Sequence, residues 1–264
     1  MIKISVITVV FNGEKHLEEA IKSVLAQNYP LLEYIIIDGG STDGTLEIIE
    51  NYQNLFASII VISEKDQGIY DAMNKGLVRA TGDIIGILNS DDYYFDNSLE
   101  KVEKFFIDRN CDFVYGSIKK ITSDGEISGI THPVKDIYNK YNMIYDIPFP
   151  HPALFVRKSV YDKVGLFDTS LKISADRDFI IRMIRSGVSG VNAEDCLVAF
   201  RDSGISSGIF VSYKEYSYIA RKYGERFLSI FWNYLKTTTK RIARRILPKM
   251  ITKKILKMKG SRYS

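Results

Sequence analysis

The chain has 264 residues, is 45% hydrophobic and 26% charged, and carries a formal net charge of +4 at pH 7. This balance excludes a disordered chain, and the 6 Pro and 18 Gly exclude collagen-like and Pro-rich low-complexity classes. The two cysteines, Cys111 and Cys196, form no Cys-x-x-Cys motif, which argues against a disulfide scaffold or a cysteine-based zinc site and fits a reducing compartment. No apolar run approaches the roughly 18 residues typical of a membrane span, and the first residues show no signal-peptide pattern.

The first 90 residues alternate between strand-like and helical patterns. Strands are expected at 3–11, 34–37, 58–62 and 83–88, and helices at 14–27, 44–52 and 69–80. Alternation at this spacing predicts βαβ units and a mostly parallel sheet in an α/β fold. Ligands of such sheets bind at the carboxyl ends of the strands.

The middle of the chain is less regular. A helix is expected at 97–107, strands at 112–121, 126–130 and 153–157, a helix at 177–186 and a last strand at 190–200. Residues 131–150 hold no clear element, and a long loop inside a compact domain is often functional.

The end of the chain differs from the rest in charge. Residues 221–264 carry 14 Lys or Arg and one acid, whereas residues 1–220 carry 22 bases and 31 acids. Aromatic and apolar residues gather at 227–235 and continue at helical spacing among the basic ones, with Pro248 as an expected break. An amphipathic helix on an anionic membrane, a helix for self-association, a nucleic-acid patch and a solvated extension all fit. No recognisable nucleic-acid module accompanies the basic residues, so nucleic acid is not an expected partner.

Acidic residues stand where the predicted strands end. Asp38 follows the second strand, Asp66 the third, and Asp91 and Asp92 the fourth. Carboxylates that converge on one edge are costly unless a cation or hydrogen-bond donors meet them. The adjacent Asp91 and Asp92 suit Mg²⁺ or Mn²⁺, which would in turn bind a diphosphate, although a solvated turn or a cap for the 97–107 helix gives the same pattern.

The Gly-rich turn after Asp38 also has two interpretations. Either Asp43 caps the helix at 44–52, or Asp38 accepts hydrogen bonds from a ligand held over the turn. Asp66 and Asp71 are likewise compatible with simple helix capping. Neither Gly-x-Gly-x-x-Gly nor Gly-x-x-x-x-Gly-Lys is present, so the sequence indicates neither a dinucleotide cofactor nor a P-loop.

Five segments, in order, resemble the inverting family-2 glycosyltransferases, which have the GT-A fold. They are TVVFN at 8–12, IIDGGSTDGT at 36–45, NSDD at 89–92, VGLFD at 164–168 and SADRD at 174–178. The resemblance runs through residues 3–202. It implies a Rossmann-like sheet and a transferase that uses a nucleotide-sugar.

The resemblance also implies roles for individual residues. Asp176 would be the general base that deprotonates the acceptor hydroxyl, and Asp92 would bind the metal that bridges the diphosphate. His151 would bind metal, diphosphate or acceptor, unless it is a structural hydrogen-bonding residue. Nucleotide-sugar contacts are implied for Thr8, Val10, Asn12, Asp38, Asp66, Asp71, Asn74 and Asp91.

Three positions depart from the family pattern. Gly39 stands where a second Asp is frequent, Ala175 where Glu is frequent, and Met73 where many members carry Arg. The stretch GIYDAMNKG at 68–76 instead resembles a subgroup of bacterial surface-polysaccharide pathways.

The expected protein is a metal-dependent inverting glycosyltransferase with a GT-A domain at 1–205 and a basic amphipathic helical tail at 206–264. Its nucleotide-sugar half is expected at residues 1–95 and its acceptor half at 96–205. We expect a UDP-sugar donor and a glycan or polyprenyl-diphosphate-linked acceptor. We also expect residues 226–258 to dock on the cytoplasmic face of a bacterial cell membrane. The sequence is compatible with a homo-oligomer but does not establish one. The alternatives are a non-catalytic, membrane-docked scaffold of the same fold, and a nucleotidyltransferase, whose basic Gly-rich first loop this sequence lacks.

Overall fold

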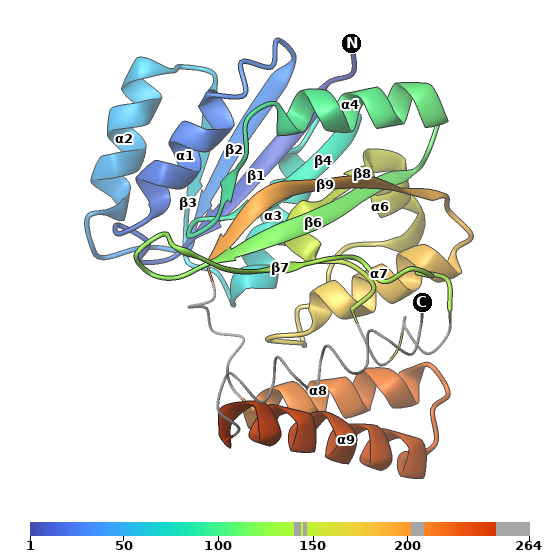
Figure 1. Ribbon diagram of the computed structural model, residues 1–264. Coiled ribbons are helices and arrows are strands. Elements are labelled where there is room, and N and C mark those ends of the chain that lie inside the picture. Colours follow the sequence, from blue (N-terminus) through green and yellow to red (C-terminus); the bar gives the residue numbers. More distant parts are fainter. Residues whose placement is uncertain (140–143, 145–146, 202–208, 247–264) are drawn as a thin grey trace. The chain divides into compact units, whose positions relative to one another are not determined.

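The computed structural model describes residues 1–139, 144, 147–201 and 209–246 (Figure 1). The chain divides into two compact units, Met1–Ser212 and Tyr213–Ser264. The domain boundary expected between residues 205 and 206 lies outside the described residues.

A single mixed sheet forms the centre of the first unit. Its strands are β1 (Ile4–Val10), β2 (Leu32–Asp38), β3 (Ile59–Ser63), β4 (Ile84–Asn89), β5 (Tyr93–Tyr94), β6 (Phe113–Ile121), β7 (Ile127–Thr131), β8 (Leu154–Arg157) and β9 (Gly190–Arg201). They are ordered β3-β2-β1-β4-β8-β6-β9-β5, and β7 pairs with β6. Strands β3, β2, β1 and β4 are mutually parallel, whereas β8 lies antiparallel between β4 and β6. This arrangement confirms the predicted α/β class with a mostly parallel Rossmann-like half.

Helices cover both faces of this sheet (Figure 1). They are α1 (Leu17–Leu25), α2 (Thr45–Leu55), α3 (Ile69–Arg79), α4 (Ser98–Arg109), the short 3₁₀ helix η1 (His151–Ala153), α6 (Lys158–Val164) and α7 (Ala175–Arg185). The strand β5, the turn η1 and the helix α6 were not expected from the sequence, because each is too short to show a period of its own.

Strand β1 is buried along its whole length, because helices pack on both of its faces. On one face, Ile4, Val6 and Val10 share a hydrophobic cluster with residues of α1, α2 and α4. On the other face, α3 approaches so closely that a Cβ on Gly76 would lie 2.4 Å from Ile7 Cγ2. The close approach fixes α3 on the sheet, and with it the loop that precedes α3.

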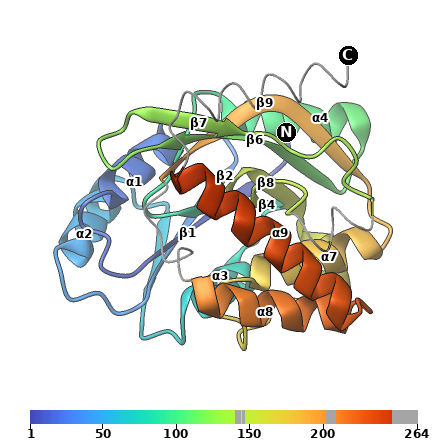
Figure 2. The same cartoon turned by 60° about the horizontal axis from the view of Figure 1, so that its bottom comes forward.

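The described part of the second unit consists of most of α8 (Ile209–Lys222) and of α9 (Phe227–Ile246), which lie side by side (Figures 1 and 2). Gly224, with φ +88°, ends α8 in the left-handed conformation that favours glycine. No helix within the described residues is long and apolar enough to cross a membrane. Pro248 and the rest of the expected membrane segment beyond residue 246 lie outside the described residues.

Candidate active site

The loops that follow β1 and β2 are bonded into one piece. Asn12 has φ +51°, and its Oδ1 accepts a hydrogen bond of 2.9 Å from the backbone N–H of Thr42. The N–H of Gly13 donates to Thr45 Oγ1 at 2.9 Å, and the N–H of Gly44 donates to Glu14 Oε2 at 2.7 Å. The two carboxyl ends of these neighbouring strands therefore form a preorganised edge.

Asp38, at the end of β2, is completely buried. Its carboxylate accepts hydrogen bonds from the hydroxyls of Ser41 and Ser63 at 2.5 and 2.7 Å, and from the backbone N–H groups of Gly40 and Ser41. Four donors from its own surroundings explain how a charged group is tolerated there. Asp38 therefore shapes the Gly-rich turn, and its side chain is not exposed at the edge.

Asp66 lies beside this turn, after β3. Its Oδ1 accepts a hydrogen bond of 2.9 Å from the N–H of Gly68, and a Cβ added to Gly39 would lie 2.3 Å from its Oδ2. The Asp66 carboxylate thus fills the space that a side chain at position 39 would need. This contact explains why Gly39 replaces the Asp that is frequent in the family.

The pair that follows β4 splits into two different environments. Asp91 is half-buried, and burial raises the pKa of its carboxyl while its own N–H, His16 and Arg201 act in the opposite direction. Asp92 is only 1% exposed, and burial together with the neighbouring Asp91 raises the pKa of its carboxyl to about 8.

Both oxygens of Asp92, the residue predicted to bind the metal, have hydrogen-bond partners within the protein. Its Oδ1 accepts from the backbone N–H of Arg201 at 2.9 Å, and its Oδ2 accepts from Asn89 Nδ2 at 3.1 Å. These bonds and its burial hold the Asp92 carboxyl deeper in the protein than that of Asp91. Asp91 is the member of the pair that remains accessible.

Arg201 is a site residue that the sequence analysis missed. Its side chain is buried among the described residues. The Nε atom donates a hydrogen bond of 3.0 Å to the carbonyl of Asp91. Nη2 forms an ion pair with Glu19 of α1, and Nη1 lies 3.4 Å from the carbonyls of Thr122 and Ser123. In the sequence, the only signal for this role is that Arg201 directly follows the apolar residues 197–200 at the end of β9. A charge at such a position is ordinarily solvated.

A second group of residues lies where α3 meets the start of α7. Tyr70 Oη is 2.7 Å from the carbonyl of Ile173 and 3.1 Å from Asp176 Oδ1. Asp176 is half-buried in the first turn of α7, where the helix dipole favours a negative charge. Its Oδ2 accepts no hydrogen bond within the described residues and is available to a ligand.

His151 is close to Asp176. It is 8% exposed, and its ring lies edge-on to Phe167, with 5.7 Å between centroids. Burial lowers the pKa of the imidazole, and the charge of Asp176 opposes that shift. His151 is therefore a neutral hydrogen-bonding group at neutral pH.

Other residues expected to touch the nucleotide-sugar have side chains that are engaged within the protein. Asn74 Nδ2 donates to the carbonyl of Phe167 and its Oδ1 accepts from the Phe167 N–H, both at 2.9 Å. Asp71 accepts from the N–H of Gln67 and pairs with Lys75 at the start of α3. Thr8 and Val10 are buried within β1, and Thr8 Oγ1 is 3.1 Å from Tyr34 Oη. These four side chains are held within the protein, and their contact with a nucleotide-sugar stays a prediction.

Within the described residues, no three His, Cys, Asp or Glu side chains come together as a ready metal site. Asp91 and His151 belong to separate groups of contacts, one at the end of β4 and the other beside α7.

The parallel β3-β2-β1-β4 edge with acids at its carboxyl end fits the GT-A fold of the glycosyltransferases that the sequence resembles. The solved structures agree on the fold. S. aureus TarS, residues 1–349 with UDP-GlcNAc, superimposes with a TM-score of 0.69 at 23% identity, covering 83% of this chain and 64% of that one. A mannosyltransferase from Pyrobaculum calidifontis, with GDP-Man and Mn²⁺, gives a TM-score of 0.64 at 16% identity, covering 98% and 80% of the two chains.

Residues 5–165 match the model of glycosyl transferase family 2. A teichuronic acid biosynthesis glycosyltransferase of Bacillus subtilis, TuaG, is 26% identical over 92% of this chain and 97% of its own length. A glycosyltransferase of Mycobacterium tuberculosis is 32% identical over 68% of each chain. The chain belongs to glycosyl transferase family 2, and it is a glycosyltransferase.

Proposed function

We propose that the chain transfers a sugar from a UDP-sugar to a hydroxyl of a glycan or lipid-linked acceptor in bacterial surface-polysaccharide synthesis. Transfer inverts the anomeric centre, and Asp176 is the general base. The observation that carries this proposal is the accessible Asp176 oxygen at the start of α7, beside Tyr70 of α3. The UDP-GlcNAc complex of TarS supports the donor class, and the name of TuaG supports the pathway class.

The proposed chemistry is a single displacement. Asp176 Oδ1 is held by Tyr70 and by the N–H of Arg177 at 2.8 Å, so the free Oδ2 is oriented to take the proton of the acceptor hydroxyl. The acceptor oxygen then bonds to the anomeric carbon while the bond from that carbon to the diphosphate oxygen breaks. His151 is uncharged and does not neutralise the base.

At the donor edge, two groups have unused hydrogen-bonding capacity within the described residues. Asn12 Nδ2 and Asp66 Oδ2 have no protein partner there. The Oδ1 atom of each side chain holds its loop in place. We assign them to the base and ribose of the nucleotide. Asp38 acts indirectly, through the turn that it organises.

Mg²⁺ or Mn²⁺ is the proposed cofactor, and Asp91 takes the ligand role expected of Asp92. Asp91 fits because it is partly exposed at the end of β4 and faces His16, whereas the oxygens of Asp92 are bonded inside the protein. When bound, the ion would act as a Lewis acid that stabilises charge on the departing nucleoside diphosphate. The Mn²⁺ in the Pyrobaculum calidifontis enzyme supports this choice of cofactor.

The second unit is proposed to dock on an anionic membrane surface at the cytoplasmic face. Helix α9 exposes Phe227, Leu228, Phe231, Trp232 and Leu235, which follow helical spacing. It lies within residues 221–264, which carry 14 bases and one acid. Phosphatidylglycerol vesicles should co-sediment with the wild type and much less with Trp232→Glu. Leu55→Glu, at an equally exposed apolar position of α2, is the control. Equal binding of both variants would contradict membrane docking through α9.

The function is tested with Asp176→Asn. The amide keeps the shape of the side chain but accepts no proton, so transfer should fall about 10²–10⁴-fold while UDP-sugar binding is retained. The matched control is Asp162→Asn, at an exposed acid of α6, and should transfer normally. Wild-type turnover by Asp176→Asn would remove Asp176 from the role of base.

A further inference from the structure

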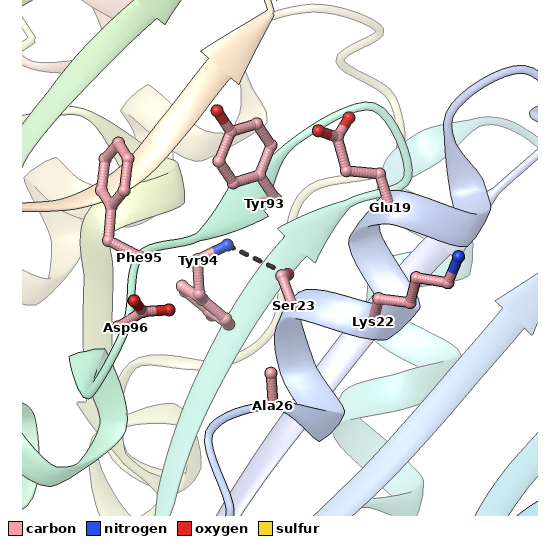
Figure 3. Close-up of a pocket in the computed structure, with 8 residues that line it drawn as sticks. All are labelled: Glu19, Lys22, Ser23, Ala26, Tyr93, Tyr94, Phe95 and Asp96. Atoms are coloured by element: carbon pink, nitrogen blue, oxygen red, sulfur yellow. Dashed lines mark hydrogen bonds between the residues drawn. The ribbon is translucent and has the colours of Figure 1, made fainter.

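A cavity lies between α1 and β5 (Figure 3). Its volume is about 320 Å³. Its lining consists of Glu19, Lys22, Ser23, Ala26, Tyr93, Tyr94, Phe95 and Asp96. Apart from Glu19, which pairs with Arg201, none of these residues has been given a role in the donor edge or in the Asp176 group.

The lining combines aromatic rings with charged hydrogen-bonding groups. The rings of Tyr93 and Phe95 meet edge to face at 5.8 Å between centroids, and Asp96 lies next to them on an exposed turn. Saccharides present apolar C–H faces and rings of hydroxyls. Aromatic rings attract the C–H faces through their negative π-faces, and carboxylates accept hydrogen bonds from the hydroxyls.

The walls of the cavity are held in place before any ligand arrives. Ser23 Oγ accepts from the N–H of Tyr94 at 3.1 Å, and Gln27 Nε2 donates to the carbonyl of Phe95 at 3.0 Å. On the other side, the ion pair with Arg201 holds Glu19. A preformed pocket loses little conformational entropy on binding, which is the usual property of a ligand site.

The charges of the cavity select among saccharides. Lys22 is paired with Glu18 of the same helix at 3.0 Å, and Glu19 with Arg201. The Asp96 carboxylate has no partner within the described residues. The lining thus carries two acids, Glu19 and Asp96, and one base, Lys22, so its charge disfavours uronic acids and favours neutral sugars.

We propose that this cavity binds a neutral sugar unit of the acceptor glycan, away from the hydroxyl that reacts. Its position supports the assignment, because Tyr93 follows Asp91 by two residues and Arg201 bonds to both Asp91 and Glu19. The occupant is therefore close to the edge assigned to the donor. This inference rests on the proposed function for the nature of the ligand, whereas the pocket itself is a feature of the structure.

The experiment follows the backbone amide signals of Tyr93–Asp96 by ¹H–¹⁵N NMR in the full chain during titration with maltose, N,N′-diacetylchitobiose and glucuronic acid. A neutral disaccharide should shift these signals with a Kd on the order of 1–10 mM. Ala26→Phe fills the cavity from an exposed position of its wall and should abolish the shifts. Ala57→Phe, at another exposed alanine, is the matched control and should bind as the wild type does.

Two results would overturn the assignment: unchanged amide signals with both neutral sugars, or the same shifts in Ala26→Phe. Stronger binding of glucuronic acid would overturn the proposed selection for neutral sugars. UDP binding by the same samples separates the two proposals. If UDP binds and the sugars do not, only the cavity assignment fails; if the sugars bind and UDP does not, the proposed donor class fails.

Discussion

The site residues in the two halves of the first unit are held in position by different kinds of contact. In the half that contains β1 to β4, neighbouring loops bond directly to one another, as between Asn12 and Thr42 or Glu14 and Gly44. In the half that contains β6 to β9, Asp176 depends on side chains that cross from one half to the other. Tyr70 reaches Asp176, and Arg201 reaches the carbonyl of Asp91. The loops after β1 and β2 therefore hold one another in place, whereas Asp91 and Asp176 each receive a contact from the other half.

Severing the Arg201 contacts should have the largest effect on this arrangement. Arg201→Met keeps the bulk of the side chain but leaves the carbonyl of Asp91 and the carboxylate of Glu19 without their donor. We expect a loss of about 3 kcal/mol in the free energy of unfolding. For a domain of this size, that loss lowers the Tm by about 10 °C in a thermal melt.

The control for this change is Arg109→Met, at an exposed arginine in the last turn of α4. It should leave the Tm within about 2 °C of the wild-type value, because an exposed charge contributes little. Equal Tm values for the two variants would mean that Arg201 does not hold the halves together.

The buried carboxyl of Asp92 should give a smaller effect that depends on pH. Its pKa is about 8 in the folded chain and 3.8 in its unperturbed state. Between these pH values the Asp92 carboxyl is ionised in the unfolded chain and protonated in the folded chain. The contribution of Asp92 to the free energy of unfolding is therefore full below pH 3.8 and is lost as the pH rises to about 8. The Tm should fall by about 5 °C between pH 6 and pH 8.5.

Asp92→Asn should remove most of that pH dependence, because an amide does not titrate. The buried Oδ1 of Asn89 has no partner within the described residues, so rotation of the Asn89 amide offers an acceptor to the new N–H group. A slope of Tm against pH that is unchanged by the substitution would place the responsible group elsewhere.

The sequence predicted most of the first half and less of the second. Strands such as β1 and β2 are long apolar segments separated by helices of clear period, and their burial on both faces leaves one consistent arrangement. In the second half, η1 and α6 are three and seven residues long, and β8 enters the sheet antiparallel. Short elements are positioned by tertiary contacts, which no local pattern records.

The same limit applies to the site. Sequence motifs predicted that acids gather after β2, β3 and β4, since strand ends are placed by topology. They did not distinguish Asp91 from Asp92, because one residue of offset decides which carboxyl faces inward. Nor did they show that Asn74 bonds to Phe167, 93 residues away in the chain.

The most direct test of the central claim is the Mn²⁺ dependence of UDP binding, measured by calorimetry on the wild type, Asp91→Asn and Asp92→Asn. The exposed edge formed by β1, β2 and β4 is the donor site in this account, with Asp91 as its metal ligand. Wild type and Asp92→Asn should therefore bind UDP more tightly with Mn²⁺ than with a chelator, and Asp91→Asn should bind equally in both. Loss of the Mn²⁺ effect in Asp92→Asn, with its retention in Asp91→Asn, would contradict the account.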